Sequence, residues 1–219
     1  MNEFIKNAQQ AIIQTLYEQN AVKINVDEPY TLKGGVVSPV FCDTGILECK
    51  AETRGRVISA MVVQIHQYCN SIQSDTDAIV GVVSGGISWA SGIANCDLIP
   101  VLRAHARPKD HGLHNQIDGE LEKDGDKVIV VDDVLTSGSS VLSVVNALRK
   151  GKSNKKAEIL AVYTILDWNL ASTNKKFEEA GVKKVCLLTM EEVLDYGFEH
   201  SLIPIEYKPA IQSFMKEHL

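Results

Sequence analysis

The chain has 219 residues, of which 45% are hydrophobic and 23% are charged. This composition is ordinary for a soluble globular protein, and the length suits one large domain or one core with a subdomain. The formal net charge of −6 argues against a nucleic-acid-binding protein and against a protein that binds anionic membranes. A local cationic pocket for a small phosphorylated substrate is compatible with that charge.

Cysteine usage and apolar runs indicate the compartment. The five cysteines are odd in number and have no C-x-x-C spacing, which predicts free thiols rather than disulfides or a zinc site. Polar residues, among them Glu3, Lys6, Gln9 and Gln10, interrupt the first ten positions, where a signal peptide needs an apolar core. No apolar run approaches the ~18 residues of a membrane span. We therefore expect a cytoplasmic protein with no membrane partner.

The N-terminal third mixes helices with a turn-rich segment. Residues 3–19 have apolar positions near helical spacing and predict an amphipathic helix. The stretch 22–45 is irregular, with short β-like pieces at 21–24 and 36–42 that prolines and glycines interrupt. Residues from about 48 to 71 again show helical spacing. A small α+β subdomain is expected here.

From residue 78 onward, short apolar runs alternate with helical segments. The runs cover residues 78–83, 98–102, 127–131, 157–166 and 184–188, and helices are expected at 87–95, 138–150 and 171–181. The runs are nearly continuous and rich in β-branched residues, as strands buried on both faces are. The sequence therefore predicts an α/β fold with a mostly parallel five-stranded sheet flanked by helices. One or two short helices are expected in the tail.

The third apolar run ends in two acids, Asp132 and Asp133, followed by a loop of small residues and a helix. Unpaired N–H groups at a helix N-terminus attract phosphate, and Gly138 lets the chain approach a ligand closely. In open parallel sheets, ligands lie beyond the carboxyl ends of the strands. Two carboxylates would repel a phosphate, so they suit sugar hydroxyls or contact through Mg²⁺. An Asp turn with a serine N-cap would explain one acid but not the pair.

The string VIVVDDVLTSGSS resembles the phosphoribosyl pyrophosphate (PRPP) motif of type I phosphoribosyltransferases. The resemblance implies that the two acids contact the ribose hydroxyls and that the loop after them cradles the 5′-phosphate. The PRPP-binding residues implied in this segment are Asp132, Asp133, Val134, Leu135, Thr136, Ser137, Gly138, Ser139 and Ser140. The turn at 81–87 is similar to the family's pyrophosphate-binding turn and adds Gly85, where some members carry a lysine.

A segment near the N-terminus is similar to the orotate branch of that family. Over residues 30–41, Lys33 matches a lysine that reaches the pyrophosphate or the base, and Phe41 matches an aromatic residue near the base. Cys42 stands where a second aromatic residue is common. Read without the resemblance, the segment is a turn-rich hairpin with a solvated lysine.

Residues 107–119 resemble the catalytic loop of the orotate branch. Displacement of pyrophosphate builds negative charge on the leaving group, which Arg107, Lys109 and His111 would neutralise. Closure of the loop, with Gly112 as a hinge, would exclude water from the reacting carbon. In the family this loop often reaches the neighbouring subunit's site, so a homodimer is implied. Read alone, the segment is a solvated charged turn.

The sequence also departs from the family pattern. An ungapped match puts His105 and Ala106 where arginine and lysine are usual, so that Arg103 or Arg107 would have to compensate. Trp168 follows an aspartate at a place where the family has a base-binding arginine. Tryptophan can stack on a base but cannot donate a bidentate pair of hydrogen bonds. A partly buried aromatic residue at a strand end explains it equally well.

The resemblance implies one phosphoribosyltransferase domain over residues 1–219. Within it we expect an N-terminal helix and hood at about 1–60, a PRPP-binding core at about 61–190 and C-terminal helices at about 191–219. The implied enzyme is an orotate phosphoribosyltransferase of pyrimidine biosynthesis, with Lys109, His111, Asp132 and Asp133 as catalytic residues. Lys33, Phe41, Cys42, Thr136 and Trp168 would bind the base. Mg²⁺ would be the cofactor, held mainly through PRPP and not by a protein metal site.

The sequence is also compatible with two alternatives. Trp168 and Cys42 are compatible with a phosphoribosyltransferase that acts on another nucleobase. Ala106 and the missing arginine are compatible with a PRPP- or nucleotide-sensing protein that has no turnover.

Overall fold

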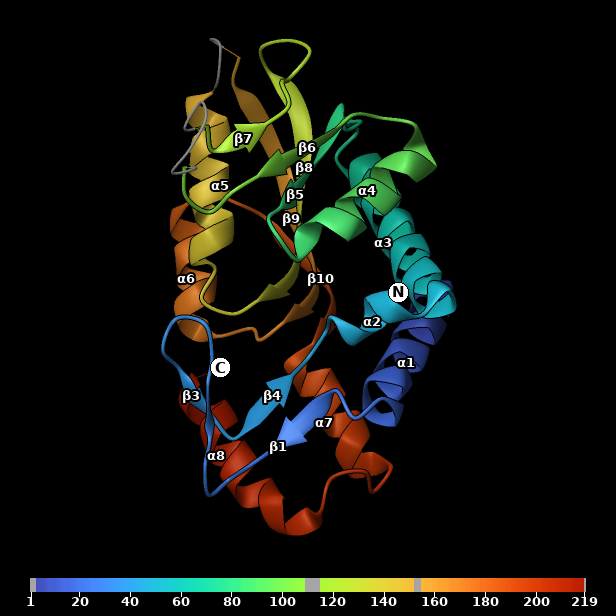
Figure 1. The fold of residues 1–219 in the computed structure, drawn as a ribbon, viewed down its shortest axis with the longest axis vertical. Coiled ribbons are helices and arrows are strands. Elements are labelled where there is room, and N and C mark those ends of the chain that lie inside the picture. The colour runs from blue at the N-terminus through green and yellow to red at the C-terminus, as the bar shows by residue number, and fades with distance from the viewer. Residues whose placement is uncertain (1–2, 109–114, 152–154, 219) are drawn as a thin grey trace.

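A computed structural model describes residues 3–108, 115–151 and 155–218. Its centre is a six-stranded sheet in the order β10-β9-β8-β5-β6-β7 (Figure 1). The strands are β5 (Ala78–Val82), β6 (Val101–Ala104), β7 (Ile117–Asp118), β8 (Asp126–Leu135), β9 (Ala157–Asp167) and β10 (Lys184–Thr189). All pairings are parallel except that of β6 with β7. The mostly parallel α/β sheet predicted from the apolar runs is therefore confirmed.

The sheet is buried on both faces, which explains its continuous apolar strands. Along β8, Ile129 and Val131 pack into one core cluster, whereas Val128 and Val130 pack into another. Successive side chains of a strand point to opposite faces, so each face needs its own cover. The first cluster draws its cover from α1 (Glu3–Glu18), α3 (Ala51–Ser71) and α4 (Gly86–Asp97), and the second from α5 (Ser139–Lys150) and α6 (Ala171–Glu179).

A second region lies below the carboxyl ends of the strands in Figure 1. Residues 22–49, which we call the hood, form two small antiparallel ribbons and a short helix. These are β1 (Val22–Ile24) with β4 (Val40–Cys42), β2 (Tyr30–Thr31) with β3 (Val37–Ser38), and α2 (Ile46–Cys49). The C-terminal elements α7 (Met190–Glu199), η1 (Ile205–Tyr207) and α8 (Lys208–His218) lie beside them.

Hydrogen bonds join the two ends of the chain in this region. From α1, Gln9 Nε2 donates to the carbonyl of Leu187 over 2.6 Å, and the Tyr17 hydroxyl donates to the carbonyl of Val193 over 2.9 Å. The N-terminal helix is thus fixed to β10 and α7.

Some element bounds differ from those that the sequence suggested. Strand β6 begins at Val101 rather than at Leu98, because Leu98 ends α4 in a left-handed conformation (φ +54°) and Pro100 has no N–H to donate. Strand β7 was not predicted, since two residues carry no readable periodicity. The five cysteines are free thiols. No helix in the described residues is long and apolar enough to cross a membrane.

Candidate active site

The loop between β8 and α5 lies at the carboxyl ends of the parallel strands (Figure 1). Gly138 precedes α5 with φ +70°, a conformation that favours glycine. A β-carbon at this position would also come within 2.8 Å of Phe177 Cε2. Both backbone conformation and packing against α6 therefore require a glycine at position 138.

Asp132 and Asp133 lie at the end of β8, immediately before this loop. Asp132 is 6% exposed, and its Oδ1 accepts the N–H of Asp133 over 3.0 Å. Asp133 Oδ1 in turn accepts the N–H of Val134 over 2.9 Å. Burial and, second, the neighbouring Asp133 raise the pKa of Asp132 well above its usual range, while Lys33 opposes the shift. Carboxyl groups in this setting suit neutral hydroxyls better than anionic groups.

A cavity of about 450 Å³ joins the two acids to the hood. Its lining comes from the hood, the β5–α4 turn, the end of β8 and the residue after β9. The lining residues are Thr31, Leu32, Lys33, Phe41, Cys42, Asp43, Thr44, Gly45, Val82, Val83, Ser84, Gly85, Asp132, Asp133, Val134, Thr136 and Trp168. Lys33 also borders a small hollow over the loop 134–141. A second cavity of about 370 Å³ between α6 and β10 does not include either of the paired acids.

The β5–α4 turn brings Gly85 against Asp133. A β-carbon at position 85 would overlap the Asp133 carboxylate, although the backbone of Gly85 (φ −62°) is open to any residue. A β-carbon at the neighbouring Gly86 would likewise overlap the carbonyl oxygen of Val131. The absence of a side chain at 85, where some family members have lysine, therefore follows from the position of the second acid.

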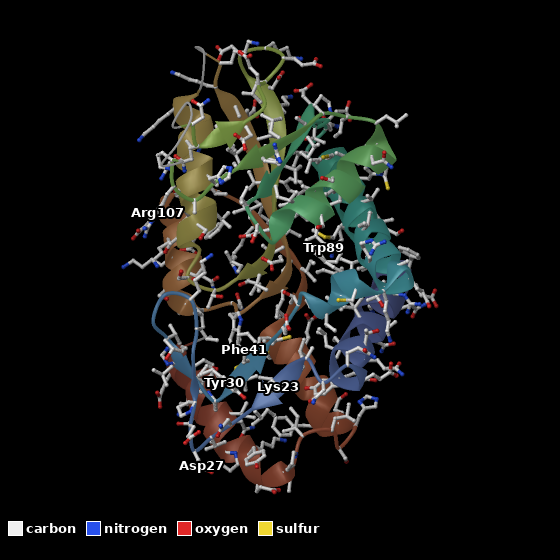
Figure 2. The ribbon with its side chains drawn as sticks, in the orientation of Figure 1. Lys23, Asp27, Tyr30, Phe41, Trp89 and Arg107 are labelled. Carbon is white, nitrogen blue, oxygen red and sulfur yellow. The ribbon has the colours of Figure 1, made fainter. Side chains whose placement is uncertain are left out.

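The hood supplies the other end of the cavity. Phe41 is 40% exposed, and its ring lies 5.7 Å from that of Tyr30, tilted by 40° (Figure 2). Cys42 is buried, and desolvation, followed by the charge of Asp43, raises the pKa of its thiol to about 12. The thiol is therefore neutral at physiological pH. Lys33 is the one basic residue among the described residues that line the cavity.

Trp168 both packs in the core and lines the cavity. The side chain is only 3% exposed, and its ring meets that of Phe214 edge-on, with centroids 6.2 Å apart. The backbone N–H of Trp168 donates to the carbonyl of Leu135 over 2.9 Å. Trp168 is thus a buried aromatic residue at a strand end, and its ring forms part of the cavity wall. Contact of this ring with a base stays a prediction.

The base of the expected catalytic loop is held by β6 and β7. His105 Nε2 lies 3.1 Å from Asp118 Oδ2, and Arg103 Nη2 lies 4.0 Å from the same oxygen. Arg107 is exposed, is not part of the cavity lining, and in Figure 2 lies on the outer side of α5, away from Phe41. Lys109, His111 and Gly112 lie outside the described residues.

Several lining residues were not singled out from the sequence. Thr31, Asp43 and Thr44 lie within two residues of Lys33 or Cys42 in the sequence, so their place in the cavity lining could have been predicted from that proximity. Phe214 had none, because its contact with Trp168 joins residues that are distant in the chain.

Comparison with known sequences identifies the family. The family described as "Phosphoribosyl transferase domain" matches residues 50–192. The orotate phosphoribosyltransferase of Lactococcus lactis subsp. lactis is 30% identical over 204 residues, which cover 93% of each chain. That of Fusobacterium nucleatum subsp. nucleatum is 31% identical over 194 residues, covering 88% of each chain.

Solved structures show the same fold at lower identity. Leishmania donovani UMP synthase superposes with a TM-score of 0.73 at 19% identity, over 94% of this chain and 42% of that longer protein. Orotate phosphoribosyltransferase from Aeropyrum pernix superposes with a TM-score of 0.66 at 20% identity, over 84% of this chain and 98% of the other. Given the sequence matches above, the chain belongs to the orotate phosphoribosyltransferases, a branch of the phosphoribosyltransferase domain family.

Proposed function

We propose that this protein transfers the phosphoribosyl group of PRPP to orotate, which gives orotidine 5′-monophosphate and pyrophosphate. One observation carries the proposal. A single cavity joins the paired acids beside the phosphate loop to Lys33 and Phe41 of the hood, in a chain about 30% identical to orotate phosphoribosyltransferases. A sugar donor at one end and a base at the other would meet within it.

The donor end suits a phosphorylated ribose. The N–H groups and hydroxyls of residues 136–140 would hold the 5′-phosphate at the start of α5, together with Val134 and Leu135 at the end of β8. Asp132 and Asp133 would accept from the ribose hydroxyls, a role that fits the raised pKa of Asp132. The backbone at Gly85, where α4 begins, would bind the pyrophosphate beside Asp133.

The acceptor end suits a planar anionic base. Phe41 and Trp168 offer aromatic surfaces, and the hydroxyl of Thr136 and the neutral thiol of Cys42 offer weakly polar contacts. Lys33 would attract the carboxylate of orotate or the pyrophosphate. With Trp168 in place of the family's arginine, Lys33 carries more of this task.

The donor set fits Mg²⁺ that arrives with PRPP. Within the described ranges, no group of three or more acidic, histidine or cysteine side chains could hold a metal ion. The cavity lining holds three carboxylates, those of Asp43, Asp132 and Asp133. These are too few for a full oxygen shell, which the phosphate and hydroxyl oxygens of PRPP would complete. Bound in this way, Mg²⁺ would neutralise charge on the departing pyrophosphate.

Residues 107–111 complete the proposed reaction. Lys109 and His111 would stabilise the leaving pyrophosphate with the help of Arg107. Arg107 lies on the outer side of α5, an orientation that suits contribution to the site of a second subunit in a homodimer. Conversion of Lys109 to alanine should then lower kcat by far more than a few-fold, and dimers that mix Lys109→Ala subunits with subunits altered at Asp133 should regain activity.

Pyrophosphate release tests the proposal directly. The protein is incubated with PRPP, Mg²⁺ and a panel of nucleobases, and turnover is expected with orotate. Turnover with a different base alone would favour the second candidate, a transferase for another nucleobase, which the buried Trp168 motivates. PRPP binding without turnover on any base would indicate a sensing protein.

A further inference from the structure

Three consecutive carbonyl groups of the phosphate loop are bound from the same side. The donors lie on the segment from Trp168 into α6, which packs beneath the loop. The pairs are Trp168 N to Leu135 O at 2.9 Å, Thr173 Oγ1 to Thr136 O at 2.5 Å, and Lys176 Nζ to Ser137 O at 3.2 Å.

These bonds orient the opposite side of the loop. In a trans peptide unit, the carbonyl and the N–H that follows it point in opposite directions, and the only cis peptide bond in the described residues is Val83–Ser84. The N–H groups of residues 136, 137 and 138 are therefore turned away from α6. No partner for them is found among the described residues. Carbonyl oxygens would repel a phosphate, whereas free N–H groups attract it.

Thr173 is the central member of this set. It lies in the first turn of α6 with 0% exposure, and its hydroxyl reaches across 37 residues of sequence to Thr136. Its methyl group faces the loop, since a β-carbon added at Gly138 would lie 3.2 Å from Thr173 Cγ2. Lys176, by contrast, makes its bond at the exposed surface. Loss of the buried hydroxyl leaves the Thr136 carbonyl without its partner.

We propose that Thr173 is a positioning residue for the donor substrate. By holding the Thr136 carbonyl toward α6, it keeps the neighbouring N–H groups preorganised for the 5′-phosphate of PRPP. It touches no substrate itself. The proposal rests on the proposed function only in assuming that a phosphorylated ribose binds at this loop, and it is independent of the base.

Three variants test this role. Thr173→Val keeps the shape of the side chain and removes the hydroxyl, whereas Thr173→Ser keeps the hydroxyl. Thr76→Val is the matched control, because the Thr76 hydroxyl also donates to a backbone carbonyl, that of Lys127, but at the amino end of the sheet. Binding of ribose 5-phosphate is measured by calorimetry without a base, and steady-state kinetics gives kcat and the KM for PRPP.

Thr173→Val should weaken ribose 5-phosphate binding and raise the KM for PRPP by about tenfold, with kcat changed less than twofold. Thr173→Ser should restore both to within about threefold of wild type, and Thr76→Val should change neither. An unchanged affinity in Thr173→Val, or a Ser variant as weak as the Val variant, overturns the proposal. Wild-type protein that fails to bind ribose 5-phosphate overturns the proposed function as well.

A second substitution covers the case in which Thr173→Val does not fold. Lys176→Met removes the exposed bond to Ser137 and should weaken ribose 5-phosphate binding by a few-fold without loss of folding. If the affinity of Lys176→Met equals that of wild type, fixation of the loop carbonyls has no role in donor binding, and the proposal is wrong.

Discussion

The Asp133 carboxylate occupies the space in which a side chain at Gly85 would lie. The β5–α4 turn and the end of β8 are therefore fitted to each other, and each limits what the other can carry. A substitution at either position should act on the donor end of the cavity.

Gly85→Ala should lower kcat/KM for PRPP by at least about tenfold, because the added methyl group must displace Asp133. The backbone at 85 tolerates alanine, so the defect should be local. Gly55→Ala in α3 is the control, since no atom lies near its β-carbon position, and it should stabilise the fold by roughly 0.5–1 kcal/mol without changing the kinetics. If Gly85→Ala and Gly55→Ala have the same kcat/KM for PRPP, the contact between position 85 and Asp133 does not matter for the donor end.

Two adjacent glycines of the hood allow the effect of backbone strain to be distinguished from the effect of contact with the phosphate loop. Gly34 and Gly35 both have positive φ (+100° and +86°), but a β-carbon at 34 would come within 2.5 Å of Ser137 Cβ, whereas one at 35 meets nothing within 4 Å. Gly34→Ala and Gly35→Ala should each lose about 1 kcal/mol of stability through backbone strain. Only Gly34→Ala should raise the KM for PRPP several-fold, measured in parallel. The same KM in both variants would show that the hood does not support the phosphate loop.

The pH dependence of stability should change in Asp132→Asn. The folded-state pKa of Asp132 lies above its unfolded value near 3.8, so between these values the folded protein binds more protons than the unfolded chain. The contribution of this carboxyl to stability therefore falls as the pH rises through that interval.

Asp132→Asn cannot ionise and should be more stable than wild type at neutral pH, by about 1 kcal/mol, while losing activity. The stability difference should shrink as the pH falls toward 3.8. Urea unfolding of both ligand-free proteins across this range measures it. If the difference in unfolding free energy between the two proteins does not vary with pH, ionisation of Asp132 does not destabilise the folded protein, and the prediction is wrong.

Phe214→Leu should affect the acceptor end alone. Phe214 supports the Trp168 ring edge-on from α8, so its loss should loosen that wall of the cavity. We expect a several-fold higher KM for orotate, an unchanged KM for PRPP, and a loss of about 1 kcal/mol in stability. An equal rise in both KM values would indicate a general loss of folding instead.

The sequence predicted the parts of the fold that repeat locally. The five parallel strands and the helices between them follow from continuous apolar runs, and the loop after Asp133 follows from a strand, an acid pair and small residues. Strand β7 and the start of β6 at Val101 were missed, since a two-residue strand has no period and the helix ending at Leu98 extends beyond its apolar pattern.

The contacts that support the site could not be predicted from local sequence patterns. Gly34 against Ser137, Thr173 below Thr136 and Phe214 behind Trp168 each join residues far apart in the chain. No local pattern encodes such pairs, because they depend on how the hood and α8 fold back on the sheet. Residue roles in the site could therefore be proposed only where a motif matched, and the residues that contact them could not be predicted.

Phe214 lies in α8, which follows the phosphate loop in the chain, and this order has a consequence for synthesis on the ribosome. The residues of the donor end, from Gly85 to Ser140, are all translated well before α8, on which the wall behind Trp168 depends. A nascent chain can thus contain every residue that we propose to bind the phosphorylated sugar while the proposed base pocket still lacks Phe214. Emergence of α8, rather than emergence of the phosphate loop, is then the step at which the cavity gains its support behind Trp168.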